Sequence, residues 1–422
     1  MKLIERFRGS KDAKTLAANF MYLSILKGIS FLFPLITLPY LAKVIGADSF
    51  GAIAFATSIM IIVETITDWG FNFTATRDVA KNRENIETVS QIFSQVFYAR
   101  IFLTIICFIG LLAVIELIPS LRAYRLLLIL TFLYIPGNIL FPQWLFQAFE
   151  RMRYITILTL LSNCVFTALV FVVIRNQSDY VYQPLLTACG YIVSGVFAQY
   201  IIYNSFKIKL LKPDFKAVFN RLKKSTDMFI SLLLPNLYTN FSTIILKSYC
   251  GDFATGVYNG GQKFQNIVDN LTGILSRTFF PFLARHKEKH HVYVLISGSI
   301  AVAASAFMFI GAQWFVNIFL SPEFEDAVMV MKIFAITPVF LFLMNTYGTN
   351  YLVIIGKENI LRNIITVVSV LGFGLTWWLT PTFSYIGAAT TVTAVWGIRG
   401  LLTFIYAKKY QSAKTRIESK QS

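Results

Sequence analysis

The chain has 422 residues, of which 56% are hydrophobic and only 14% are charged, and its mean hydropathy is +0.63. Soluble domains contain about 45–50% apolar and about 25% charged residues, so this composition excludes an ordinary water-soluble enzyme. Lys and Arg outnumber Asp and Glu by 38 to 21, a balance that would indicate nucleic-acid binding in a soluble protein. Here the basic residues lie in short clusters between long apolar runs, which is typical of charge that orients a membrane protein.

Long apolar runs predict an all-α integral membrane protein. A helix needs about 20 apolar residues to cross the hydrocarbon core of a bilayer. Runs of this length predict twelve transmembrane helices, over residues 16–40, 47–70, 92–117, 125–149, 154–175, 182–206, 226–249, 254–280, 292–318, 327–353, 360–380 and 383–407. The first run is too long for the apolar region of a signal peptide, so we expect it to be retained.

The distribution of basic residues predicts the orientation of the chain. Of the 38 Lys and Arg residues, 28 fall in the N-terminal segment, in alternate connections and in the C-terminal tail, and only 5 fall in the opposite connections. Because cytoplasmic loops are enriched in Lys and Arg, both termini are expected in the cytoplasm.

The longest basic connection predicts the domain organisation. It divides the chain into a first six-helix bundle (1–206), a basic cytoplasmic connector (207–225), a second six-helix bundle (226–407) and a cytoplasmic tail (408–422). A faint internal repeat aligns two series of residues: Lys43, Asp48, Gly51 and Glu64 with Lys247, Asp252, Gly256 and Asp269. A repeat with one membrane orientation indicates two bundles related by an axis along the membrane normal.

Charged side chains inside the predicted spans are the main functional signal. A charge at the centre of a membrane costs about 2.5–3.5 kcal/mol on insertion scales, so such residues usually face water or a charged partner. Five cations lie in spans: Lys27, Arg100, Lys263, Lys332 and Arg399. Lys332 can reach the interface, so we expect the other four to line a cationic, substrate-binding cavity that a phosphate would neutralise.

An alternative interpretation is that these ions form buried pairs that fix the helix packing. Examples would be Lys27 with Glu64 and Lys263 with Asp269. The spacing in the span 254–280 favours a wet face instead, because its polar residues form one helical stripe: Asn259, Gln262, Lys263, Asn266 and Asn270. In the span 125–149, Pro136, Gly137 and Pro142 predict a kinked or interrupted helix.

Catalytic and metal-binding patterns are absent from the sequence. The three histidines, His286, His290 and His291, cluster in one basic loop, and the four cysteines share no metal-type spacing. No phosphate-binding loop of the G-x-x-x-x-G-K-[ST] type occurs. We therefore expect no catalytic residues, no metal and no cofactor, and we do not expect an enzyme.

Several segments resemble the Wzx-type polysaccharide (O-antigen) flippases of the multidrug/oligosaccharidyl-lipid/polysaccharide exporter superfamily. The resemblance covers the layout of the whole chain and is most specific in the first 155 residues. The segments that carry it are Leu38–Gly46 with Phe50-Gly51, Asp68–Asn72, Ala75–Asp78, Lys81–Arg83, Trp144–Arg151 and Gly256–Tyr258 leading to Lys263.

The resemblance implies a flippase of the bacterial inner (cytoplasmic) membrane. Such a protein would move an oligosaccharide repeat unit on undecaprenyl diphosphate from the cytoplasmic to the periplasmic leaflet by alternating access. A proton or sodium gradient would drive it, with Glu64 and Asp269 as candidates for ion coupling or gating. Membrane lipids, a polysaccharide polymerase and chain-length proteins are the implied partners, and nucleic acid is not.

Two other functions are alternatives to a flippase. An ion-coupled multidrug exporter would share the twelve spans, but it would be expected to have an acid-rich cavity for cationic drugs. A membrane-embedded glycan-modifying enzyme would need a His/Asp/Glu cluster at one membrane face. The sequence leaves open the sugar composition, the choice between lipopolysaccharide and capsule, the coupling ion and the oligomeric state.

Overall fold

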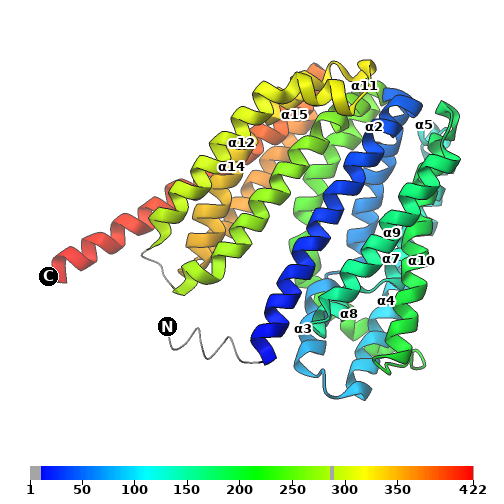
Figure 1. Ribbon diagram of the computed structural model, residues 1–422, viewed down its shortest axis with the longest axis horizontal. Helices are drawn as coiled ribbons and strands as arrows, with labels where there is room; N and C mark the ends of the chain where they lie inside the picture. Colours follow the sequence, from blue (N-terminus) through cyan, green and yellow to red (C-terminus); the bar gives the residue numbers. More distant parts are fainter. Residues whose placement is uncertain (1–10, 286–288, 422) are drawn as a thin grey trace. The chain divides into compact units, whose positions relative to one another are not determined.

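The computed structural model describes residues 11–285 and 289–421, which are helical throughout apart from short connections and contain no strand (Figure 1). The elements in chain order are α2 (Lys11–Asp68), α3 (Phe71–Lys81), α4 (Ile86–Leu117), α5 (Pro119–Arg122), α6 (Arg125–Phe132), α7 (Tyr134–Leu140), α8 (Gln143–Ala148), α9 (Met152–Val173), η1 (Gln177–Tyr182), α10 (Gln183–Asn204), α11 (Phe215–Arg285), α12 (His290–Phe319), η3 (Pro322–Phe324), α13 (Ala327–Phe334), α14 (Thr337–Leu343), η4 (Met344–Val353) and α15 (Glu358–Gln421).

Each of the three longest helices contains one residue with non-helical backbone angles. The residues are Gly46 in α2 (φ 71°, ψ 176°), Gly251 in α11 (φ 86°, ψ −175°) and Ser384 in α15 (φ 54°, ψ −137°). A positive φ favours glycine, which explains the residue type at the first two breaks. Each long helix therefore consists of two helical arms joined at a single residue.

The helix predicted over residues 125–149 is interrupted, as the proline content indicates. It is divided into α6, α7 and α8, and Pro142 lies immediately before α8 with φ at −75°. Proline removes a backbone donor and clashes with the preceding turn, so a continuous helix cannot pass through this point. The predicted break is confirmed.

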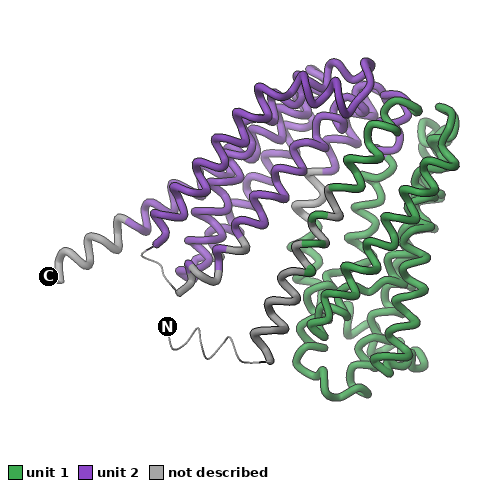
Figure 2. Tube along the Cα trace, in the orientation of Figure 1, with its two compact units in different colours: residues 1–45, 56–236 green, residues 46–55, 237–422 purple. Residues whose placement is uncertain are grey.

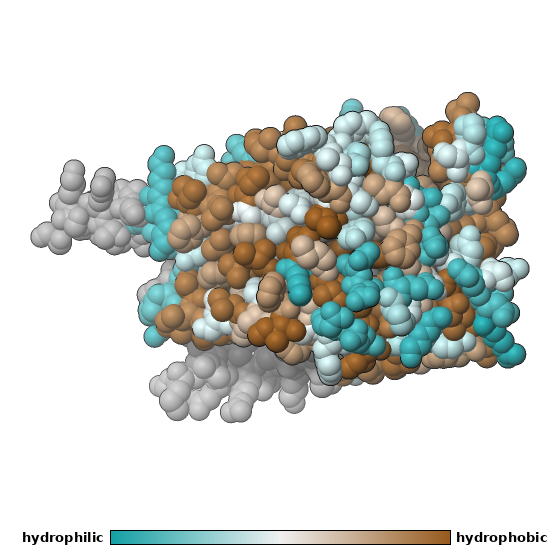
Figure 3. Space-filling model, turned by 90° about the horizontal axis from the view of Figure 1, so that it is seen from above, coloured by the Kyte–Doolittle hydropathy of each residue, from teal (hydrophilic) through white to brown (hydrophobic). Residues whose placement is uncertain are grey.

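The described residues contain eight helical stretches long and apolar enough to cross a membrane, and hydrophobic side chains cover much of the face in Figure 3. These stretches establish a multi-pass membrane protein, while the number twelve remains a prediction. Two of the eight, Leu32–Lys81 and Asn359–Gln411, are about twice the usual span and contain the breaks at Gly46 and Ser384. The helix α11, which contains many polar residues, is not among these eight stretches.

The chain forms two compact units (Figure 2). Unit 1 comprises the chain up to Ile45 together with Ala56–Asn236, and unit 2 comprises Gly46–Phe55 together with the chain from Leu237 onward. The sequence places a connector at 207–225, whereas residues 215–225 begin α11 within unit 1. The predicted bundle boundaries stay a prediction.

In unit 1 the start of α11 is held against α3 by charge. The guanidinium of Arg221 lies 2.7 Å from the carboxylate of Asp78, and the ammonium of Lys224 lies 2.9 Å from the same oxygen. The indole N–H of Trp69 donates to the carbonyl of Leu222 over 3.0 Å, and Trp69 stacks on Phe229 with the ring centres 4.0 Å apart. Most of the predicted connector is thus an ordered part of this unit.

In unit 2 two helical arms cross at a pair of glycines. A Cβ atom at Gly51 would overlap the carbonyl oxygen of Asp252, and one at Gly256 would overlap the carbonyl oxygen of Ala47. The contact is reciprocal, because each glycine approaches the carbonyl oxygen of the residue four positions before the other glycine. The internal repeat seen in the sequence therefore meets itself at this crossing, where only glycine allows the backbones to approach.

We predict that Gly51→Ala and Gly256→Ala each destabilise the protein by about 1–3 kcal/mol, because a backbone must shift to accommodate the new methyl group. The measurement is thermal unfolding of the purified protein in detergent. The control is Gly110→Ala, at an exposed helical position where a Cβ would meet nothing within 4 Å. Equal midpoints for Gly51→Ala and Gly110→Ala would contradict the close crossing.

Candidate functional site

Unit 1 contains a buried polar cluster centred on Arg100 of α4. Arg100 is 3% exposed, and its Nη2 donates to Oδ1 of Asn138 over 2.6 Å. Asn138 in turn donates to Oε1 of Glu64 over 3.0 Å, and the Tyr134 hydroxyl donates to the same oxygen over 3.2 Å. Asn138 therefore bridges the predicted cation and the predicted acid.

A second carboxylate, Asp68, lies one helical turn beyond Glu64 and is 8% exposed. It accepts hydrogen bonds from the backbone amides of Gly70 and Asn72, and the charge of Arg100 acts on both acids. Oδ1 of Asp68 and Nε of Arg100 are buried without a hydrogen-bond partner among the described residues. Two carboxyl groups thus lie in the surroundings of one guanidinium.

The side chain of Lys27, another predicted cavity residue, lies outside the part of the chain whose side chains the structure describes. The suggested pair between Lys27 and Glu64 is therefore a prediction still. Within the described residues, Glu64 is bound by Asn138 and Tyr134 instead.

In unit 2 the second arm of α11 has two different faces. One face is buried: Tyr258 packs on Phe334 of α13 with ring centres 5.9 Å apart, and Phe264 packs on Phe315 of α12 at 5.6 Å. The polar stripe predicted from the sequence lies away from that face. Its members Lys263 and Asn266 are exposed, and Asn259, Gln262 and Asn270 are half-buried.

Lys263 forms no hydrogen bond or ion pair with any described residue. The alternative pair with Asp269 is thus not formed, although the two side chains lie on the same arm. Contact between an ammonium group and lipid tails is costly, since no group there can solvate the charge. An exposed Lys263 is therefore favoured where water solvates its ammonium group, and there it can bind an anion.

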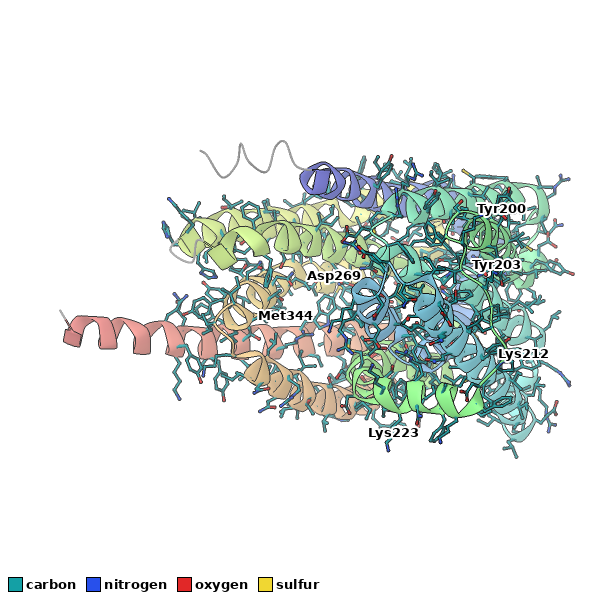
Figure 4. The ribbon with its side chains drawn as sticks, turned by 90° about the horizontal axis from the view of Figure 1, so that it is seen from below. Tyr200, Tyr203, Lys212, Lys223, Asp269 and Met344 are labelled. Carbon is teal, nitrogen blue, oxygen red and sulfur yellow. The ribbon has the colours of Figure 1, made fainter. Side chains whose placement is uncertain are left out.

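Asp269 lines a cavity of about 260 Å³ in unit 2. The walls are the inner part of α11 and the π-helical segment η4, and the lining residues are Asp269, Asn270, Gly273, Ser276, Asn345 and Thr349. Figure 4 shows Asp269 together with Met344, the first residue of η4. The described lining residues other than Gly273 have polar side chains that can form hydrogen bonds, and none of the described ones is Lys or Arg.

The fourth predicted cation, Arg399, lies half-buried on the second arm of α15. Its carbonyl accepts a hydrogen bond from Thr403, and the neighbouring Gly397 and Gly400 allow close packing on Phe340 of α14. Arg100 contacts Asn138 in unit 1, whereas Lys263 and Arg399 lie on different helices of unit 2.

Sequence reasoning missed the polar partners of the charged residues. Tyr134 and Asn138 lie four residues apart on α7, and this spacing places both on one helix face. The sequence therefore contained a pattern from which this polar pair could have been predicted. Asn345 and Thr349 on η4 were missed for a different reason. A π-helical segment departs from the 3.6-residue period, and that period is the basis of the sequence pattern.

We predict that Asn138→Ala destabilises the protein by about 2–3 kcal/mol, because the change leaves buried charged groups of Arg100 and Glu64 without their bridge. Thermal unfolding in detergent measures the effect. The matched control is Gln313→Ala, which removes an exposed amide that donates to Oδ1 of Asn317. If both variants unfold at the wild-type temperature, the bridge contributes nothing to stability.

Two curated relatives are similar over most of the chain. A protein of Escherichia coli (strain K12) named "Putative O-antigen transporter" is 27% identical over 388 residues, which is 90% of this chain and 94% of the relative. A protein of Shigella dysenteriae with the same name is 24% identical over 353 residues, covering 82% of this chain and 88% of the relative.

Two solved structures share the fold at low sequence identity. The lipid II flippase MurJ in an inward closed conformation has a TM-score of 0.75 at 12% identity, covering 92% of this chain and 87% of that chain. An inward-facing multidrug resistance MATE family transporter of the MOP superfamily has a TM-score of 0.72 at 13% identity, covering 94% and 99%. The chain therefore shares the fold of these two structures.

A family model described as polysaccharide biosynthesis protein matches residues 16–287, which include nearly all of α2, the elements from α3 to α10, and all of α11 with the polar stripe. Together with the helical membrane fold, this match shows that the chain belongs to the polysaccharide biosynthesis protein family.

Proposed function

We propose that the protein is a flippase for a lipid-linked oligosaccharide, and that it carries out transport and not catalysis. The substrate would be a repeat unit on undecaprenyl diphosphate, moved from the cytoplasmic to the periplasmic leaflet of the bacterial inner membrane. Support comes from the family match, from the two relatives named as O-antigen transporters and from the fold shared with a lipid II flippase.

The observation that carries this proposal is the polar face of the second arm of α11. Lys263 is exposed on a helix whose opposite face is packed, and it forms no ion pair with the described residues. An exposed ammonium at membrane depth is stable if it faces water and can meet an anion. A diphosphate is such an anion, and charge-assisted hydrogen bonds to its oxygens would be strong.

We propose that Lys263 lies on a cationic, water-filled path through the protein. The other predicted cations, Lys27, Arg100 and Arg399, would belong to the same path. Arg100 differs from Lys263, because Glu64 and Asp68 share its surroundings. Its bond to Asn138 supports a positioning role that depends on the charge state of those acids. Lys263 and Arg399 are therefore the stronger candidates for direct contact with the diphosphate.

The proposed topology has twelve membrane helices in two six-helix bundles, with both termini in the cytoplasm. Each arm of α2, α11 and α15 counts as one span, which gives six. The stretches α6–α8 and α13–η4 count as one span each, and the helices α4, α9, α10 and α12 bring the number to twelve. The bundles would be 1–206 and 226–407, joined by the connector 207–225 and followed by the tail 408–422.

We further propose that a proton or sodium gradient drives transport through Glu64 and Asp269. Each acid lies thirteen residues after a crossing glycine, so the two occupy equivalent positions in the repeat. Protonation of Glu64 would alter the bridge through Asn138 to Arg100, which couples an ion to a helix contact. A polysaccharide polymerase and chain-length proteins would act on the delivered unit.

The test is transbilayer movement of a prenyl-diphosphate oligosaccharide, bearing the glycan of the source strain, in proteoliposomes. We expect the wild type to exceed empty liposomes, and we expect Lys263→Ala to lower the rate about tenfold by removing a charge-assisted contact. Lys263→Arg should retain activity. Lys332→Ala is the control, because that exposed lysine lies over the ring of Phe309, at 5.9 Å.

A second candidate function is an ion-coupled multidrug exporter, which the fold shared with a MATE transporter favours. It predicts efflux of a cationic dye from the same proteoliposomes. Dye efflux, combined with no acceleration of the lipid-linked oligosaccharide under either a proton or a sodium gradient, would replace the flippase proposal.

A further inference from the structure

The connector 207–225 carries a group of lysines on the surface of unit 1. It contains seven Lys and Arg residues and one acid, Asp214, which accepts a hydrogen bond from the backbone N–H of Ala217 over 3.1 Å. Arg221 and Lys224 bind the carboxylate of Asp78. The other five cations are exposed: Lys207, Lys209, Lys212, Lys216 and Lys223. A surface with charge of one sign attracts ligands of the opposite sign.

The extended part of the connector is fixed along α4. Two serines of α4 accept hydrogen bonds from its backbone N–H groups: Ser90 from Lys209 over 3.1 Å and Ser94 from Leu211 over 2.8 Å. Successive side chains of an extended chain point to opposite faces. Ile208 is accordingly fully buried, whereas Lys207 and Lys209 on either side of it are exposed. The backbone of these two lysines is therefore held in place while their side chains point outward.

The helical part of the connector, which begins α11, has two different faces. Val218 and Leu222 are buried against the unit. On the other face, Phe215 is 78% exposed and Phe219 is 69% exposed. Phe215, Phe219 and Lys223 follow one another at intervals of four residues, so they form one stripe. A stripe of aromatic and basic side chains can contact apolar and anionic groups at the same time.

The neighbouring membrane helices place the connector at the surface of the bilayer. Both α4 and the stretch Gln177–Asn204, which contains α10, are long and apolar enough to cross a membrane, and the connector begins three residues after Asn204. Tyr200 and Tyr203, near the end of α10, are exposed, and tyrosine is enriched at the interface between membrane and water. Figure 4 shows these tyrosines together with Lys212 and Lys223 of the connector.

We propose that the connector is a binding surface for anionic phospholipid headgroups, with Phe215 and Phe219 inserted below the phosphates. Four to eight basic residues beside a membrane helix are typical of such surfaces. The headgroup region offers phosphates to the lysines and an apolar layer to the phenylalanines, whereas a soluble acidic partner offers only the first. The proposal depends on the membrane fold and not on the transported substrate, so it goes beyond the proposed flippase function.

The test is the lipid preference at the connector, measured on the full-length protein in proteoliposomes. In a background without the four native cysteines, Asn220→Cys, exposed beside Phe219, carries a bimane fluorophore. The vesicles contain equal amounts of phosphatidylglycerol and phosphatidylcholine, and one of the two carries brominated acyl chains that quench the fluorophore. We expect brominated phosphatidylglycerol to quench several times more strongly, because each lysine favours an anionic lipid about fivefold.

A second label and two charge-matched double variants are the controls. At Val302→Cys, an apolar position on α12 that is 61% exposed, both lipids should quench equally. Lys216→Gln with Lys223→Gln should lower the preference at position 220 at least about fivefold. Lys408→Gln with Lys409→Gln, exposed on α15, removes the same charge and should leave the preference unchanged.

The phenylalanines are tested with the same label. Phe215→Ala with Phe219→Ala should reduce quenching by both lipids, because the label would lie farther from the acyl chains. In the unsubstituted connector the preference should also fall at high ionic strength, since salt screens exposed charges. Equal quenching by the two lipids, no quenching by either, or an equal loss in both lysine double variants would overturn the proposal.

Discussion

A polar group at membrane depth must find a partner within the protein or face water, because lipid tails offer neither hydrogen bonds nor charge. The two units meet this constraint differently. In unit 1, Arg100 is buried with Asn138, Glu64 and Asp68, and it donates a hydrogen bond to Asn138. In unit 2, Lys263 is exposed on a polar helix face and has no described partner. The first arrangement favours a fixed packing, and the second requires a solvent or ligand.

The glycines of the internal repeat determine how the helical arms that carry the charged residues are arranged. Gly46 and Gly251 break α2 and α11 at equivalent places, and Gly51 and Gly256 allow the arms that follow to cross in close contact. The N–H of Ala47, just after the first break, donates to Oε2 of Glu323 over 2.9 Å, which satisfies one free donor of that arm. The break at Gly46 thus leaves this donor of the new helix end satisfied.

The helical membrane fold and the polar stripe of α11 could be predicted from local patterns in the sequence. Apolar runs give the membrane helices, a spacing of three and four residues gives the stripe, and Pro136 and Pro142 give the interrupted span. The surroundings of each charge could not be predicted. Asn138 reaches Glu64 across 74 residues of chain, and η4 changes the helical period where Asn345 and Thr349 meet the cavity. Such contacts depend on tertiary packing and not on local spacing.

The most direct measurement of the central claim is the accessibility of the α11 stripe to water. In a background without Cys107, Cys164, Cys189 and Cys250, single cysteines at Lys263, Asn266 and Asn270 would be treated with a charged maleimide in native membranes, beside Ile310→Cys on the highly exposed apolar surface. The account predicts rapid reaction at the three stripe positions, since thiolates form only in water, and little reaction at 310. Reaction no faster at the stripe than at 310 would place this face against lipid and contradict the account.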